Sequence, residues 1–152
     1  MTRFHPVVCV ALMLLVGCSS DGEPQPVAND YELTPPITSR SPENTEGGPP
    51  SERTDSWYVN DDRTIWMLNQ NWVPGKRTKT AWFRPARTQI EATGRRLDGD
   101  APPLVFSTPP GDSYRHRFTP SSMTFPEAGV WEITAKAGGS EARFVVEVRE
   151  SE

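Results

Sequence analysis

Two adjacent glycines, at positions 138 and 139, separate two stretches near the C-terminus in which every second residue is apolar. The apolar positions before the glycines and after them each recur at every second residue: Trp131, Ile133 and Ala135, then Ala142, Phe144, Val146 and Val148. This period places all of them on one face of a strand. Because Gly-Gly suits a two-residue turn that needs positive φ, the pattern predicts an antiparallel β-hairpin.

A two-residue turn also predicts the register of this hairpin. It places Ala137 opposite Ser140, and the remaining pairs follow in order: Lys136 with Glu141, Ala135 with Ala142, Thr134 with Arg143, Ile133 with Phe144, and Trp131 with Val146. The apolar pairs then share one face, and the Lys136–Glu141 and Thr134–Arg143 pairs share the other. A slip of one residue would invert both faces, so we expect the face that carries Trp131 to be buried.

The rest of the C-terminal part also favours strands over helices. No stretch keeps an apolar period of 3.6 residues for three turns, and proline and glycine recur throughout. Short runs at intervals of about ten residues predict further strands at Thr64–Leu68, Thr80–Arg84, Gln89–Thr93, Pro103–Ser107 and Tyr114–Thr119, with a short one at Met123–Phe125. The first five of these and the two strands of the hairpin make about seven antiparallel strands, as in an immunoglobulin-like all-β sandwich.

Residues 18–55 differ sharply in composition from this part of the chain. They contain seven prolines, eight acidic residues, two basic residues and one aromatic residue, Tyr31. Such a segment buries too little apolar surface to offset its conformational entropy. We therefore expect a disordered, Pro-rich acidic tether at 18–55, followed by one globular domain at 56–152 that contains all five tryptophans.

The N-terminus has the three parts of an export signal. Arg3 supplies a positive charge, Val7–Val16 is a run of ten apolar residues, and Leu15-Val16-Gly17-Cys18 ends it. The run is shorter than the ~20 residues that a membrane-spanning helix needs and fits a signal-peptide core. The segment resembles the signal peptide and lipobox of bacterial lipoproteins. That resemblance implies cleavage between Gly17 and Cys18, leaving residues 1–17 as the signal peptide.

The same resemblance implies how the mature chain is held in the cell. Cys18 would receive a diacylglycerol and then an acyl chain, and Cys9 would leave with the signal peptide. We therefore expect an extracytoplasmic protein that is lipid-anchored to the cell membrane or to an outer membrane, where the lipid on Cys18 contacts the bilayer.

The stretch from Phe125 to Ala135, Phe-Pro-Glu-Ala-Gly-Val-Trp-Glu-Ile-Thr-Ala, resembles the final strands of bacterial extracytoplasmic immunoglobulin-like domains. In such domains an aromatic residue and a glycine precede a strand whose own aromatic residue enters the core. With the lipobox and the Pro-rich segment, the chain resembles a family of small, uncharacterised bacterial surface lipoproteins. This resemblance implies the sandwich fold and a place in the cell envelope; such folds host many functions.

The residues for catalysis, metal binding and nucleic-acid binding are sparse in the mature chain. His116 is its one histidine, and its spacing from Asp112 and Ser113 matches no ordered triad. The alternation around it predicts a packed histidine. A copper site from Met67, Met123 and His116 lacks the clustering of such sites, and a zinc site lacks ligands. The domain is nearly neutral, without the basic stripe that nucleic acids require. We expect no enzyme activity, no metal and no cofactor.

Two groups of residues are candidates for binding a partner. Trp57, Trp66 and Trp72 lie among asparagines and glutamine, as in modules that stack sugar rings, and tryptophan also strengthens protein interfaces. Arg84, Arg95 and Arg96 lie in a locally basic stretch that could contact anionic headgroups. Solvated loops and rings that cover a sheet edge are the simpler interpretations. We expect a non-catalytic binding or scaffold domain whose partner is another envelope protein, with a glycan-binding module as the alternative.

Overall fold

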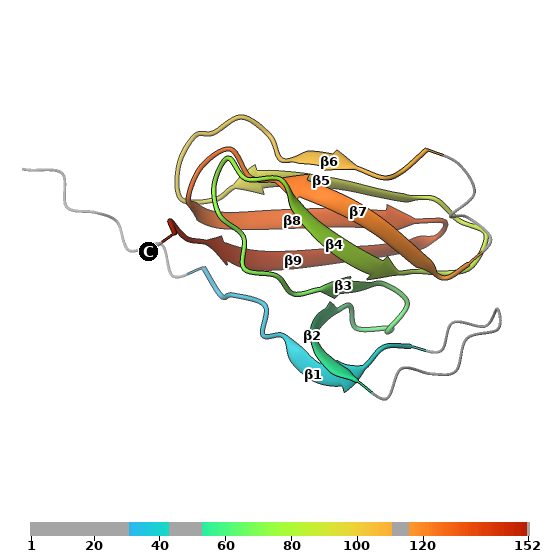
Figure 1. Ribbon diagram of the computed structural model, residues 1–152. Helices are drawn as coiled ribbons and strands as arrows, with labels where there is room; N and C mark the ends of the chain where they lie inside the picture. The colour runs from blue at the N-terminus through green and yellow to red at the C-terminus, as the bar shows by residue number, and fades with distance from the viewer. Residues whose placement is uncertain (1–30, 43–52, 111–115, 152) are drawn as a thin grey trace, which may run out of the picture.

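The computed structural model describes residues 31–42, 53–110 and 116–151. These residues form two antiparallel β-sheets packed face to face (Figure 1). The larger sheet has the strand order β1-β2-β3-β4-β7-β6, and the smaller sheet has the order β5-β8-β9. No helix long and apolar enough to cross a membrane occurs in these three ranges.

The described residues contain nine strands, of which the two in the C-terminal hairpin are the longest. Their bounds are β1 Ile37–Arg40, β2 Thr54–Val59, β3 Trp66–Leu68, β4 Thr78–Phe83, β5 Ile90–Arg96, β6 Val105–Ser107, β7 Phe118–Thr124, β8 Gly129–Ala137 and β9 Ser140–Val148.

The last seven strands have the arrangement of an immunoglobulin constant-type sandwich. In that fold four strands in the order A-B-E-D face three in the order C-F-G. Here β3-β4-β7-β6 occupies the first set and β5-β8-β9 the second. The predicted immunoglobulin-like fold is thus confirmed. β1 and β2 extend the larger sheet by two strands beyond the seven.

The β8–β9 hairpin has the predicted register. Ala137 lies opposite Ser140, Ile133 opposite Phe144 and Trp131 opposite Val146. Gly138 has a φ of 61°, the conformation that favours glycine in a two-residue turn. A Cβ atom there would also lie 2.8 Å from the Thr88 side chain, so glycine is required for conformation and for space.

A chain of aromatic contacts crosses the core between the sheets. Phe144 contacts Tyr58, Tyr58 stacks on Trp72, Trp72 contacts Phe125 and Phe125 contacts Trp131, with ring centres 5.4–5.9 Å apart. Such contacts contribute about 0.5–1.5 kcal/mol each beyond the area that they bury. Since Tyr58 belongs to β2, they join the added strand to the immunoglobulin-like core.

The predicted strand at Tyr114–Thr119 and the short one at Met123–Phe125 are a single strand, β7, that begins only at Phe118. His116 and Arg117 precede it in a bend, and Tyr114 lies outside the described residues. Pro120 argues against a continuous strand because it has no N–H to donate. It is accommodated because β6 pairs only with Ser122–Thr124, which leaves one side of β7 open at Pro120.

Part of the predicted tether belongs to the fold. β1 pairs with β2 from Ile37–Trp57 to Arg40–Thr54, so the prediction of disorder is wrong for residues 31–42 and 53–55. Composition misled here because a short strand needs few apolar side chains when a neighbouring strand supplies hydrogen bonds. The remaining tether residues, the predicted signal peptide, Gly17 and Cys18 lie outside the described residues.

Substitution of Trp131 tests the hairpin register. Trp131 is fully buried, whereas the Lys136 side chain is 63% exposed. We expect Trp131→Ala to lower the free energy of unfolding by about 3–5 kcal/mol, and Lys136→Ala by well under 1 kcal/mol because exposed ion pairs contribute little. Urea denaturation followed by tryptophan fluorescence and circular dichroism measures both. Equal effects would contradict the register.

Candidate functional site

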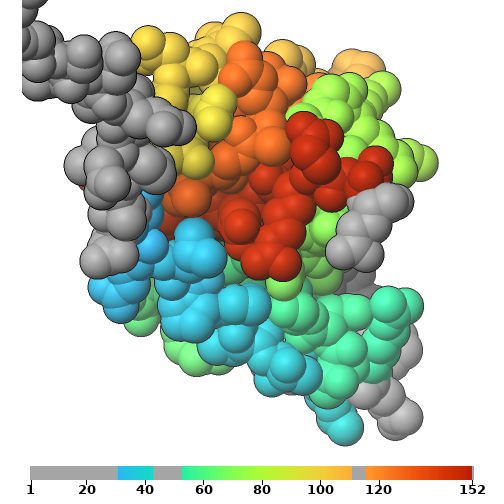
Figure 2. All heavy atoms as spheres, turned by 90° about the vertical axis from the view of Figure 1, so that its left-hand side faces the viewer, coloured from blue at the N-terminus to red at the C-terminus, as the bar shows by residue number. Residues whose placement is uncertain are grey.

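Residues 31–36, here called the strap, lie beside β9, which is an edge strand of the smaller sheet. The Thr34 N–H donates to the Val145 carbonyl at 2.9 Å, and the Val145 N–H donates to the Thr34 hydroxyl at 2.8 Å. In Figure 2 this N-terminal segment, in blue, lies against the red C-terminal strand. The strap then continues into β1, so one short segment contacts the smaller sheet and joins the larger one.

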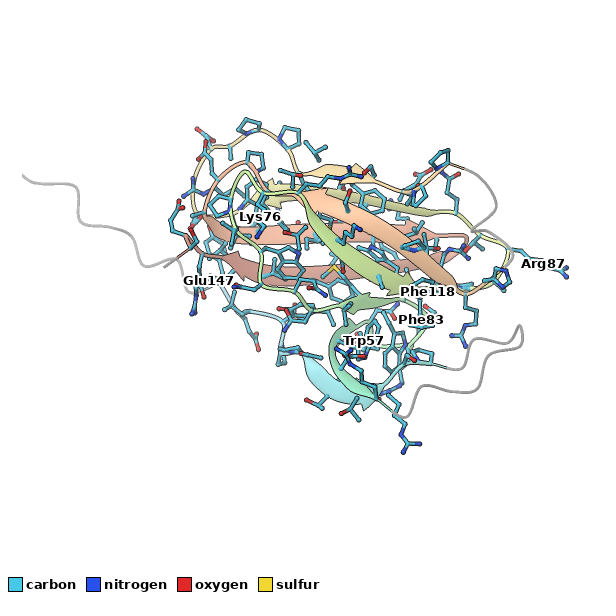
Figure 3. The ribbon with its side chains drawn as sticks, in the orientation of Figure 1. Trp57, Lys76, Phe83, Arg87, Phe118 and Glu147 are labelled. Atoms are coloured by element: carbon cyan, nitrogen blue, oxygen red, sulfur yellow. The ribbon has the colours of Figure 1, made fainter. Side chains whose placement is uncertain are left out.

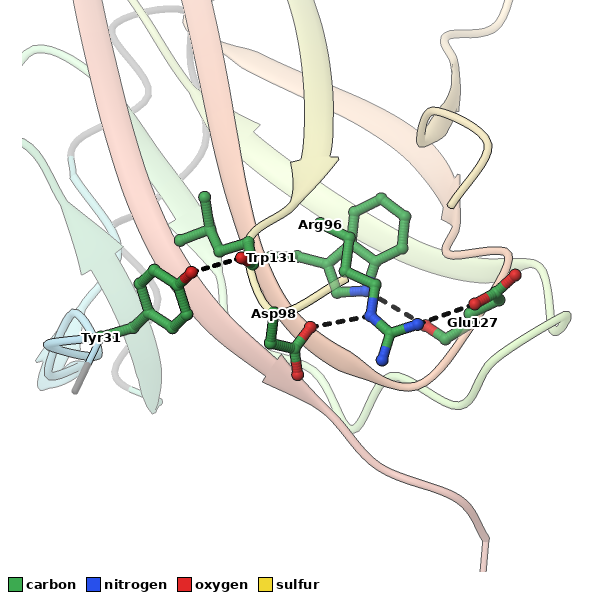
Figure 4. A network of polar contacts seen from close by, with 6 residues as sticks. Tyr31, Arg96, Asp98, Glu127 and Trp131 are labelled. Atoms are coloured by element: carbon green, nitrogen blue, oxygen red, sulfur yellow. Dashed lines mark hydrogen bonds and ion pairs between the residues drawn. The ribbon is translucent and has the colours of Figure 1, made fainter. Parts of the chain in front are cut away.

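The start of the strap is held by a second contact, on the loop after β5. The Tyr31 hydroxyl donates to the Leu97 carbonyl (Figure 4). Beside it, Arg96 forms ion pairs with Asp98 and with Glu127, each at 2.7 Å. Glu127 also accepts, through its backbone carbonyl, a hydrogen bond from the Trp131 indole at 3.1 Å. This polar network joins the β5–β6 loop, the β7–β8 turn and the strap.

The charges in this network stabilise the ionised form of Asp98. Partial burial alone would raise the pKa of Asp98, but hydrogen bonds from Arg96 and from the Val130 N–H lower it below its usual value. Gly129 lies against the pair with a φ of 138°, and a Cβ atom there would lie 2.6 Å from Arg96 Nε. The close approach of this turn therefore requires glycine.

Two open hollows lie on either side of the strap. The first, of about 630 Å³, is lined by strap residues, by the loop 59–62 and by Glu141, Ala142 and Arg143 of β9. The second, of about 440 Å³, is lined by the strap, Tyr58, the loop 69–72 and the later part of β9. Together the two hollows form a groove along β9, and the strap covers only its middle. Space therefore remains along β9 on both sides of the strap.

The edge of β9 that faces away from β8 presents backbone groups and charges toward this groove. Successive residues of a strand direct their N–H and C=O groups to opposite sides. Because Val145 bonds the strap, Arg143 and Glu147 direct theirs the same way. Within the described ranges, the hydrogen bonds to this edge come from Thr34 at Val145 and from Asn60, whose side chain donates to the Glu141 carbonyl at 3.1 Å. The edge is therefore partly open for pairing.

The three tryptophans that were candidates for stacking on sugar rings are buried. Trp57, Trp66 and Trp72 are 3%, 5% and 2% exposed. The indole of Trp57 donates to the Ser39 carbonyl and that of Trp66 to the Arg63 carbonyl. Rings buried in this way present no face to a sugar, so the prediction of a glycan-binding surface on these residues is wrong. Polar neighbours in the sequence were misleading because they occupy the loops that flank the rings.

The rings also belong to two separate clusters. Trp72 lies in the core between the sheets, whereas Trp57 and Trp66 pack with Phe83 in a second cluster. Figure 3 shows Trp57, Phe83 and Phe118 together at one end of the larger sheet. The Phe83 and Phe118 ring centres are 5.5 Å apart, and Phe118 is 38% exposed. This cluster stabilises the attachment of β2 to β3 and β4.

The arginines predicted to contact anions do not form one surface. Arg84 is fully buried and donates to the His116 carbonyl at 2.8 Å, so the prediction that it faces a ligand is wrong. Arg95 pairs with Glu132 at 2.9 Å, and Arg96 with Asp98 and Glu127. Lys76 and Arg87, two further basic residues of the stretch from Lys76 to Arg96, lie at opposite ends of the molecule (Figure 3).

The catalytic and metal sites considered from the sequence involve His116 and the acidic residues. No group of three or more histidine, cysteine, aspartate or glutamate residues there could hold a metal ion. His116 is half-buried in the bend before β7, and its backbone carbonyl accepts from Arg84. Asp112 and Ser113 lie outside the described residues.

Sequence reasoning missed the strap and its partner on β9. Tyr31, Leu33, Pro35 and Ile37 recur at every second position, which is the period of a strand. That signal could have identified an extended, packed segment, but the surrounding prolines and acidic residues outweighed it.

Comparison with known proteins supports the fold. No protein-family model matches the chain, and no significant match was found among curated proteins. The structure is similar to a solved structure described as "Putative Lipoprotein from Bacillus anthracis", with a TM-score of 0.51 and 14% sequence identity. The match covers 79% of this chain and 87% of that one. At this identity the similarity concerns the fold.

The Asp98 contacts predict a pH-dependent contribution to stability. A carboxyl whose pKa is lowered by folding stabilises the fold above its unfolded pKa, near 3.8, and this contribution is lost as the pH falls through the folded value. We expect Asp98→Asn to lower the free energy of unfolding by about 0.5–1 kcal/mol at pH 7, as for a partly exposed ion pair. The difference from the wild type should shrink below about pH 4.

Urea denaturation at pH 7 and pH 3 measures this effect. The control is Asp100→Asn, which removes an exposed carboxyl two residues away and should change stability little at either pH. A difference between Asp98→Asn and the wild type that is as large at pH 3 as at pH 7 would contradict the electrostatic origin.

Proposed function

We propose that this chain is a lipid-anchored, non-catalytic binding or scaffold domain of the cell envelope. Three observations support the proposal: the lipobox that ends at Cys18, the immunoglobulin-like sandwich, and the name of the structural neighbour, which describes a lipoprotein. The lipid on Cys18 would contact the membrane, and the protein partner would be another component of the envelope.

The strap supports a position close to the membrane. Tyr31 is already attached to the fold through Leu97, so this residue lies 13 positions along the chain from Cys18, from the difference between positions 31 and 18. Even a fully extended chain of that length spans no more than about 45 Å. If the whole segment from Cys18 to Asp55 were free, the domain could lie much further from the membrane. The domain would therefore act near the bilayer surface.

The observation that carries the binding role is the partly open edge of β9 with a hollow on each side of the strap. Edge strands with free backbone groups pair readily with other chains. A domain held near the membrane with such an edge is suited to contact a neighbouring envelope protein. An immunoglobulin-like sandwich provides a rigid frame for that contact.

Lipidation of Cys18 is the most direct test of the anchor. We expect metabolic labelling with a palmitate analogue to mark the wild-type protein and not the Cys18→Ser variant, which should also lose membrane attachment. Fractionation of cells expressing each form, followed by immunoblotting, measures both. A Cys18→Ser protein that remains as strongly membrane-bound as the wild type would contradict the proposal.

Partner binding is tested separately by cross-linking in intact cells followed by affinity purification. The matched control is an otherwise identical Cys18→Ser protein, which retains the domain without the anchor. We expect a distinct envelope protein to be recovered with the wild type at least fivefold more efficiently than with the control. Recovery of only highly abundant proteins, in equal amounts with both, would contradict a specific binding role.

A further inference from the structure

The edge of β9 carries a regular pattern of charge along its solvent-facing side. Glu141, Arg143, Val145, Glu147 and Arg149 recur at every second position, and all but the half-buried Val145 are exposed. Asn60 and Thr34 bond the backbone of Glu141 and Val145. Because the backbone direction alternates along the strand, Arg143 and Glu147 direct their N–H and C=O groups to the same side, and Arg149 follows directly after the end of β9. A strand added there would meet both the hydrogen-bonding groups and these charges.

We propose that this edge is a docking site for an extended peptide segment of a partner protein, which pairs antiparallel with β9 in place of the strap. The proposal rests on the binding role above and specifies the class of partner. Addition of a strand to an exposed sheet edge is a general mode of peptide recognition, in which main-chain hydrogen bonds provide affinity and alternate side chains provide specificity.

The strap shows that the groove accepts an extended chain but pairs with it incompletely. Within the described residues it bonds β9 at Val145 alone, and one of the two bonds uses the Thr34 side chain in place of its backbone. Pro35 and Pro36 have no N–H, so they cannot donate to β9 beyond Thr34. A segment without prolines could bond Arg143 and Glu147 as well and would extend into both hollows.

The charges on the edge determine the chemistry of this segment. An antiparallel strand centred on Val145 would place one residue opposite Glu147 and another opposite Arg143. A basic residue at the first position and an acidic residue at the second would form favourable cross-strand pairs, in addition to the ion pairs that Arg143 makes with Glu141 and Arg149 makes with Glu147. A slip of two residues either way would place like charges together, at Arg149 or at Glu141. The pattern therefore selects both a sequence and a register.

The position of the larger sheet indicates that the occupant of the β9 edge is a single peptide and not a second copy of this domain. β2 lies beneath the edge of β9, where the Tyr58 ring contacts that of Phe144 with centres 5.8 Å apart, and β1 continues this sheet further. Two domains paired through β9 about a two-fold axis would each bring β1 and β2 into the space below the other's edge. One extended chain, such as the strap, fits there without this conflict.

The probe for the test is the fluorescently labelled peptide Ser-Thr-Lys-Thr-Val-Thr-Glu-Thr-Ser. Its control, Ser-Thr-Glu-Thr-Val-Thr-Lys-Thr-Ser, has the same composition with the two charges exchanged. Each is titrated by fluorescence anisotropy against the full chain and against Thr34→Pro, which removes both strap bonds to Val145. A second variant, Thr34→Val, removes only the hydroxyl and keeps the shape of the side chain, so it serves if Thr34→Pro does not fold.

We expect the Lys-first peptide to bind Thr34→Pro at least tenfold more tightly than the wild type, because the competing strap is weakened. Thr34→Val should show a rise of at least twofold. The Glu-first peptide should bind Thr34→Pro at least fivefold more weakly than the Lys-first peptide binds it. Exchange of the edge charges, Arg143→Glu with Glu147→Arg, should reverse the preference between the two peptides, and added salt should reduce it.

Three results would overturn the proposal. The first is no binding of either peptide to a folded strap variant, and the second is equal binding of both peptides. The third is concentration-dependent dimerisation of Thr34→Pro in sedimentation experiments that the Lys-first peptide does not reverse, since the occupant would then be a second copy. Failure of peptide binding with Cys18-dependent partner recovery intact would reject this edge and leave the proposed function standing.

Discussion

The hydrogen-bonded register between β8 and β9 is the constraint on which the rest of the sandwich depends. It directs Trp131, Ile133, Phe144 and Val146 to one face, and the larger sheet closes over that face through the aromatic contacts that reach Tyr58. Because β8 also pairs with β5 along its other side, β9 becomes the edge of its sheet. The position of the candidate site follows from this hairpin.

An exposed edge strand of nine residues invites unwanted pairing, and the strap limits it. Edges in natural proteins are protected by charges and by covering segments, and both occur here: the charges of β9, and the strap with its Pro35 and Pro36. The same features that limit promiscuous pairing also select for a complementary strand. Protection and recognition are therefore two aspects of one arrangement, and the strength of the strap sets the balance between them.

The parts of the fold that the sequence predicts are those where local and global signals agree. The hairpin combines alternation with a glycine turn, so its register could be predicted pair by pair. The burial of Trp57, Trp66 and Trp72 could not be predicted, because polar neighbours in a loop do not show which way a ring points. The strap was missed for a different reason: its stability comes from the Val145 backbone and the Leu97 carbonyl, which lie far away in the sequence. The composition of the strap alone does not show which distant residues it will contact.

The central claim is that residues 31–36 are an integral part of the domain and hold the edge of β9. Hydrogen exchange of the Thr34 and Val145 amides, measured by NMR in the full chain, tests it most directly, with the buried Phe144 amide as the internal reference. We predict that Thr34 and Val145 exchange at least a hundredfold more slowly than the same amides in an unstructured peptide. Exchange of both at the unstructured rate, while Phe144 remains protected, would contradict the account.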